Sequence, residues 1–145
     1  MSLFSTLDIA ASGLSAQRLR IDLIAGNLAN VHTTRTVSGG PFRRQLPVFQ
    51  ARDYYSIRPG SGTPLLGGGG VRVLGIIEDH SPSNPLKKVY DPSHPDAVDD
   101  YVLYPNVNPV MEMADLIVAS RAFEANLAVM EASKQLITRA LTIGR

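Results

Sequence analysis

The sequence contains no cysteine. This absence excludes disulfide bonds, thiolate metal ligands and a cysteine nucleophile, and it leaves the redox compartment undetermined. At 145 residues the chain is long enough to bury a core but short for two independent domains. Its fold therefore has to be stabilised by packing alone.

An excess of charge and long apolar runs are also missing. The net charge of +1 provides no large field to hold a nucleic acid or an anionic membrane surface. The charge-free stretches 23–34 and 59–71 are shorter than a membrane span. A cleaved signal peptide is not expected, because the first basic residue is Arg18 and Asp8 interrupts the apolar start. We therefore expect no nucleic-acid partner and no membrane-spanning segment.

Glycine, proline and tyrosine are scarce at both ends and concentrated in the middle. Nine of the twelve glycines, nine of the ten prolines and all five tyrosines lie between Val31 and Pro105. Residues that disfavour helices are therefore concentrated in the central segment, and both ends have a helix-like composition.

Apolar residues near the N-terminus recur at alternating steps of four and three, which is typical of a helix with one packing seam. We predict a helix over residues 3–29, where Asn27 and Asn30 tolerate the left-handed turn that ends a helix. Seven of the eight seam positions are apolar. These positions are Leu3, Leu7, Ala10, Leu14, Gln17, Ile21, Ile24 and Leu28.

The C-terminal segment has the same period, and we predict a second helix over residues 109–143. Asn108 is expected to be the N-cap, and Pro109 suits the first helical position. The negative charge of Glu112 is favourable near the positive N-terminal end of the helix. Seven of the nine seam positions are apolar. They are Met113, Leu116, Ser120, Phe123, Leu127, Met130, Lys134, Ile137 and Leu141.

The central segment has strand and turn signals. Residues 67–70 and 91–96 are predicted as loops because they lack any period. Short strands are expected where β-branched and aromatic residues lie between Pro and Gly breaks, at residues 42–54, 71–78, 87–90 and 101–104.

The fold class that follows is mainly α with a small β segment. The long N- and C-terminal helices are expected to pair as a coiled-coil-like antiparallel bundle, with a Pro/Gly-rich β-hairpin and loop insertion between them. In domain terms, residues 1–30 hold the N-terminal helix of the helical core, 31–108 the insertion, and 109–145 the C-terminal helix.

A second apolar stripe lies beside each seam, so each helix requires cover on more than one side. Either the central β segment folds over these stripes, or neighbouring subunits cover them. Polar residues at Gln17, Ser120 and Lys134 interrupt the seams, as rim positions or as a register lock. The second stripes comprise Ile9, Ala16, Leu19 and Leu23 in the first helix, and Ala114, Ile117, Val118, Ala122, Ala125, Ala128 and Val129 in the last.

Candidate catalytic or metal-binding residues are few. Residues 67–70 are four consecutive glycines. The run is not followed by the Lys and Ser or Thr of a phosphate-binding loop, so a flexible loop is expected there. Two histidines have acidic neighbours but no spacing that fixes a ligand geometry, and we expect no catalytic residue, metal site or cofactor. These residues are His80 with Glu78 and Asp79, and His94 with Asp91, Asp96, Asp99 and Asp100.

Arg43 and Arg44 form a small basic pair beside Phe42. Two charges on a strand are usually solvated, although they could contact an acidic neighbour or a cell-wall glycan. We therefore expect both side chains at the surface.

Five segments resemble flagellar rod and hook proteins. The first, SGLSAQRLRIDLIAGNLANVHTTRT at residues 12–36, is similar to the N-terminal signature of that family, with Asn27, Asn30 and Thr33 in the places of an Asn-x-x-Asn-x-x-Thr turn. The others are GGPFRRQ at 39–45, YDPSHPDA at 90–97, YVLYPNVN at 101–108 and ASRAFEAN at 119–126. The resemblance extends in order over nearly the whole chain.

The resemblance implies a non-enzymatic subunit of the proximal rod, exported uncleaved by the flagellar type III apparatus. Its implied partners are copies of itself, other rod proteins and the adaptor between the MS ring and the rod. The alternative function is a secreted oligomeric module whose central β segment binds cell-wall glycan. Under the assembly hypothesis the packing residues are Leu7, Leu14, Ile21, Leu28, Leu116, Phe123, Leu127, Met130, Ile137 and Leu141.

Overall fold

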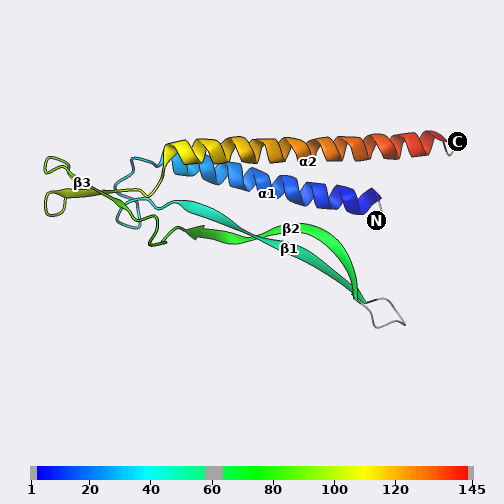
Figure 1. Cartoon of the computed structure of the whole chain (residues 1–145), viewed down its shortest axis with the longest axis horizontal. Coiled ribbons are helices and arrows are strands. Elements are labelled where there is room, and N and C mark those ends of the chain that lie inside the picture. The colour runs from blue at the N-terminus through cyan, green and yellow to red at the C-terminus, as the bar shows by residue number, and fades with distance from the viewer. Residues whose placement is uncertain (1–2, 58–63, 144–145) are drawn as a thin grey trace. The chain divides into compact units, whose positions relative to one another are not determined.

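The computed structural model describes residues 3–57 and 64–143 (Figure 1). It is mainly helical with two small sheets, as the sequence predicted. The elements in chain order are α1 (Leu3–Ala29), β1 (Gln45–Ile57), β2 (Pro64–Glu78), β3 (Lys87–Tyr90), β4 (Tyr101–Tyr104) and α2 (Pro109–Ile143).

The backbone divides into two compact units, and both helices contribute to each. The first unit contains Met1–Leu19, Val48–Gly75 and Ala119–Arg145. The second contains Arg20–Pro47 and Ile76–Val118. The predicted division of the chain into an N-terminal helix (1–30), an insertion (31–108) and a C-terminal helix (109–145) stays a prediction.

The predicted bounds of both helices are confirmed, and the start of α2 follows the predicted capping. Asn108 Oδ1 accepts a hydrogen bond from the Val110 backbone N–H at 3.1 Å, and the Glu112 N–H donates to the Asn108 carbonyl at 3.0 Å. Pro109, at the first helical position, has no N–H that would need a partner. The N-cap assignment was therefore right.

The predicted left-handed end of α1 was wrong. Among the described non-glycine residues only Asp99 and Asp100 have positive φ, so neither Asn27 nor Asn30 does. Asn30 instead uses its side chain, because Nδ2 donates to the Gly26 carbonyl at 2.9 Å and Oδ1 accepts from Thr33 Oγ1 at 3.1 Å. The Gly26 carbonyl thus accepts from both the backbone and the side chain of Asn30 at the end of α1.

The helices pack in opposite directions within each unit. In the second unit Asn27 Nδ2 donates to Glu112 Oε2 at 3.2 Å, and Arg20 pairs with Asp115 at 3.7 Å. In the first unit a Cβ placed on Gly13 would lie 3.0 Å from the Asn126 side chain, so the two helices approach closely there. Small residues are among those most deeply buried along the pair, namely Ala10, Ala16, Ala119 and Ser133.

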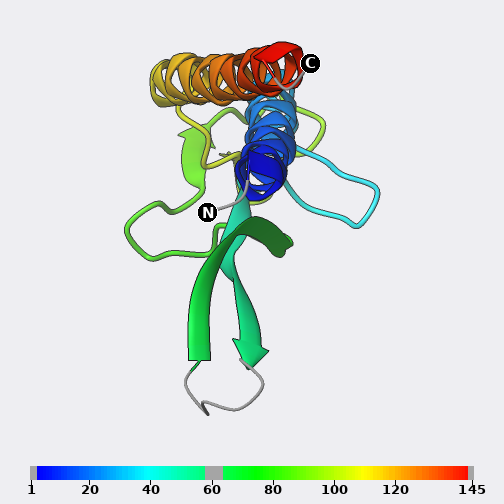
Figure 2. The ribbon, with the colours of Figure 1, turned by 90° about the vertical axis from the view of Figure 1, so that its right-hand side faces the viewer.

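The two strands β1 and β2 form an antiparallel ribbon (Figure 2). The prediction that residues 67–70 form a loop was wrong, because β2 begins at Pro64 and includes them. Gly70 has φ +87°, and a Cβ there would overlap the Ser12 hydroxyl of α1. The Val71 N–H donates to that hydroxyl at 3.0 Å. The glycine is therefore needed where the ribbon approaches α1.

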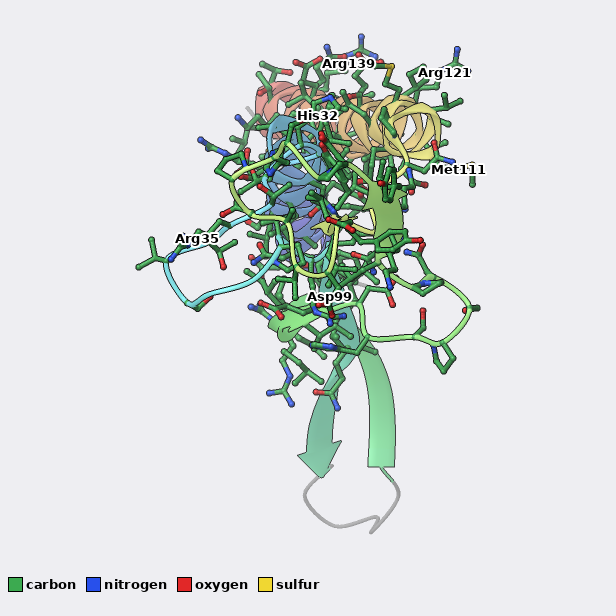
Figure 3. All side chains as sticks on the ribbon, turned by 90° about the vertical axis from the view of Figure 1, so that its left-hand side faces the viewer. His32, Arg35, Asp99, Met111, Arg121 and Arg139 are labelled. Carbon is green, nitrogen blue, oxygen red and sulfur yellow. The ribbon has the colours of Figure 1, made fainter. Side chains whose placement is uncertain are left out.

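The other two strands, β3 and β4, have the predicted bounds and pair antiparallel, with Val89 opposite Val102. Asp99 and Asp100 form the two-residue turn that returns the chain into β4, with φ of 51° and 66° (Figure 3). Val98 and Tyr101 exchange backbone hydrogen bonds of 2.9 and 3.1 Å across this turn. Positive φ at both central residues is the geometry of a type I′ turn.

We expect Gly70→Ala to destabilise the chain by about 1–3 kcal/mol, because it combines a positive φ with an overlap against Ser12. Urea unfolding of the purified chain measures the change. Gly75→Ala is the matched control in the same strand, since no atom lies within 4 Å of a Cβ there. Equal effects of the two substitutions would contradict the close approach of β2 to α1.

Candidate functional site: a buried polar cluster and an exposed helix face

A buried polar cluster lies in the second unit, at the start of α2. Glu112 is 1% exposed, and its carboxylate accepts hydrogen bonds from Arg44 Nε and Asn27 Nδ2. Arg44 also donates through Nη2 to Asp115 Oδ2 at 3.1 Å. A buried carboxylate is tolerated only with such partners, so Glu112 needs both Arg44 and Asn27.

The Asn27 side chain joins α1 to β1 by a reciprocal pair of hydrogen bonds. Its Nδ2 donates to the Gln45 carbonyl at 3.0 Å, and its Oδ1 accepts from the Gln45 N–H at 2.9 Å. Asn27 is 1% exposed, so these bonds are made away from water. The side chain therefore replaces a strand partner at the first residue of β1.

Asn106 extends the cluster towards the turn after β2. Its Oδ1 accepts from the Arg44 N–H at 2.9 Å, and its Nδ2 donates to the carbonyls of Asp79 and Asn84 at 3.0 Å each. Asn84 in return donates to Asp79 Oδ2 at 2.9 Å and to the Asn106 carbonyl at 3.0 Å. The turn at residues 79–84 and the segment before α2 are thus both held next to Arg44, immediately before β1.

The acid side chain of this turn is held ionised. Hydrogen bonds from the Ser81 hydroxyl, the Asn84 amide and the Ser81 backbone, together with the charge of Arg44, lower the pKa of Asp79 from 3.8 to about 2. Partial burial opposes this shift. Asp79 therefore serves the turn as a hydrogen-bond acceptor.

The expectation that Arg44 is solvated was wrong. Its side chain is 22% exposed and binds two carboxylates of α2. Arg43, by contrast, forms no ion pair with any described residue. The sequence pattern Arg-Arg before a strand could not separate the two, because the carboxylates lie 68 and 71 residues further along the chain.

The histidines and their acidic neighbours do not converge. Nε2 of His80 lies 3.4 Å from Oε2 of Glu78, and both side chains are more than half exposed. His94 Nδ1 accepts from the Asp96 N–H at 3.1 Å within its own loop. No group of three or more His, Asp or Glu residues among residues 3–57 and 64–143 is placed to hold a metal ion.

The packing residues expected from the seams differ in burial. Leu127 and Leu141 are exposed, at 41% and 70%. Gln17 Oε1 is enclosed and has no hydrogen-bond partner among the described residues, while Lys134 is exposed. The half-buried members are Leu7, Leu14, Ile21, Leu28, Leu116, Phe123, Met130 and Ile137.

The two second stripes have different surroundings. On α1 the stripe is covered, because Ile9, Leu19 and Leu23 are half-buried and Ala16 is buried. The stripe of α2 remains open, with Ala122 alone half-buried. Its exposed members are Ala114, Ile117 (57%), Val118 (57%), Ala125, Ala128 and Val129 (46%).

Arg121 and Arg139 lie on the same outer side of α2 and point away from α1 (Figure 3). Further exposed apolar residues accompany them, including Val110 at 74% and Leu136 at 55%. The outer face of α2 is the candidate interaction surface.

Two family descriptions match the chain. One, the flagella basal body rod protein family, matches residues 7–35, and the other, the C-terminal region of the flagellar basal body rod FlgEFG proteins, matches residues 99–143. Asn27 lies in the first match and Glu112 in the second, so the buried cluster joins the two. These matches define the class as flagellar basal-body rod proteins.

Relatives over the full length sharpen this assignment. The flagellar basal-body rod protein FlgC of Borreliella burgdorferi is 49% identical over 99% of this chain and 98% of its own. FlgC proteins of Bacillus subtilis and Salmonella typhimurium are 42% and 38% identical, each over 100% of both chains. The chain belongs to the FlgC family, which confirms the resemblance seen in the sequence. Nothing in these comparisons supports a glycan-binding module.

We expect Arg44→Ala to destabilise the chain by about 3–5 kcal/mol, because it leaves the buried Glu112 carboxylate without its counter-charge. Urea unfolding of the purified protein measures this loss. Arg43→Ala, one residue away, should change stability by no more than about 0.5 kcal/mol. The pairing is disproved if both substitutions cost the same.

The lowered pKa of Asp79 predicts an acid-dependent loss of stability. Because the folded-state pKa lies below the ordinary value, the contribution is complete above pH 3.8 and is lost as the pH falls towards 2. Unfolding free energies of the parent chain and of Asp79→Asn should therefore converge across this window. A stability difference that stays constant with pH would rule out this role for Asp79.

Proposed function

We propose that this chain is a structural subunit of the flagellar rod, which polymerises by helix packing into the drive shaft that transmits torque to the hook. The observation that carries the proposal is the apolar outer face of α2, which no described segment of the chain covers. Burial of apolar surface stabilises by roughly 25 cal/mol per Å². Partners that cover this face therefore gain most of their affinity from it.

The buried polar cluster supports a mechanical role. The buried cluster of Asn27, Arg44 and Glu112 holds distant segments together, and its polar groups bind one another. The proposed mechanism therefore needs no catalytic residue. Torque would be shared by many helix contacts acting in parallel.

The proposed location is the basal-body rod, reached through the flagellar type III export apparatus without cleavage of a signal peptide. The proposed partners are other copies of the chain, other rod proteins and the adaptor between the MS ring and the rod. Among the described residues, neither helix is long and apolar enough to cross a membrane. The names of the FlgC relatives support the rod as the location.

We expect Ile117→Asp to abolish rod assembly and swimming, because it places a charge on the exposed apolar stripe. The purified variant should retain its stability within about 0.5 kcal/mol, since Ile117 is exposed in the single chain. Swimming in soft agar and electron microscopy of isolated basal bodies provide the measurements.

Ile117→Leu is the control, because it keeps the face apolar. Normal rods assembled from Ile117→Asp subunits would refute the role of this face.

A further inference from the structure

A groove of about 560 Å³ lies in the first unit, between α1 and the ribbon of β1 and β2. Its α1 side is built largely from small residues, including Ala11, Ser12 and Ser15. Its ribbon side includes Val71 and Val73. Small side chains leave room for a helix to approach closely.

The groove is also basic. Arg52 and Arg72 both line it, and Asp8 is the one acid among its lining residues. Arg72 donates to the neutral Gln50 side chain at 2.8 Å, and Arg52 forms no ion pair with any described residue. Arg72 also donates to Gln50 Oε1 through Nη2, so its partner is a neutral oxygen and its positive charge, like that of Arg52, is not neutralised by a described carboxylate.

A complementary strip lies on α2 in the same unit. Leu127 is 41% exposed, with Glu124 one turn before it and Glu131 one turn after it. The two acids are seven residues apart, so they lie on one face about 10 Å from each other. Neither forms an ion pair within residues 3–57 and 64–143.

We propose that the strip Glu124–Leu127–Glu131 of one copy docks in the groove of a second copy. Leu127 packs on the small residues Ala11 and Ser15, and the two glutamates bind Arg52 and Arg72. Charge complementarity selects a second copy as the occupant, because one chain carries both the acidic strip and the basic groove.

The two surfaces are different, so the contact is heterologous. Such head-to-tail contacts form a ring where the rotation between subunits closes, and an open helical array where it does not. This inference rests on the proposed function and assigns a surface to each side of one subunit contact.

The absence of native cysteine allows a direct test. Two differently tagged chains, one carrying Ala11→Cys and the other Leu127→Cys, are expressed together in cells that lack the parent chain. Mild oxidation of the isolated basal bodies should then produce a disulfide-linked dimer that carries both tags. Because each chain has one cysteine, this dimer can only be intermolecular.

The control pair combines Leu127→Cys with Asp22→Cys, a residue that is exposed on α1 but does not line the groove. Cells that swim but give no more cross-link for the test pair than for the control pair would overturn the groove contact. The proposed rod function would stand in that case, because swimming shows assembly separately.

Charge exchange provides the second test and covers the case in which cysteine variants do not assemble. Glu124→Arg with Glu131→Arg should abolish swimming, and adding Arg52→Glu with Arg72→Glu in the same chain should restore it. Without restoration by the fourfold variant, the proposed pairing is wrong.

Discussion

The pairing of Arg44 with the buried carboxylate of Glu112 is the constraint on which the second unit depends. Burying a carboxylate that is 1% exposed is costly unless a partner pairs with it, and Arg44 provides that partner by placing the chain before β1 against the first turn of α2. Asn27 binds the same carboxylate and both backbone groups of Gln45. One buried group thus fixes the end of α1, the start of β1 and the start of α2.

The first unit is held by another kind of contact. Gly13 and Gly70 allow close approaches to α1's neighbours: a Cβ at Gly13 would lie 3.0 Å from the Asn126 side chain of α2, and one at Gly70 in β2 would overlap the Ser12 hydroxyl of α1. The second stripe of α1 is buried or half-buried, whereas most of the corresponding stripe of α2 is exposed. The single chain therefore buries the second apolar stripe of α1 but not that of α2. This is expected of a subunit whose remaining apolar surface is buried by neighbours.

Local features of the structure were predictable from the sequence. Both helices and the two short strands have the expected bounds, because apolar period, the Asn108 cap and Pro and Gly breaks act over a few residues. The long strands were less predictable: the four glycines have low strand propensity, yet they lie in β2 where Gly70 meets Ser12. Contact with α1 outweighed local preference there.

The sequence by itself determined the two helices, their second apolar stripes and, through its motifs, membership of the rod protein family. Only the tertiary structure decided which stripe is covered, and that Arg44 rather than Arg43 is internal. The physical reason is separation along the chain. Helix period is set by neighbouring turns, whereas the partners of Arg44 lie about 70 residues away and are brought to it by folding.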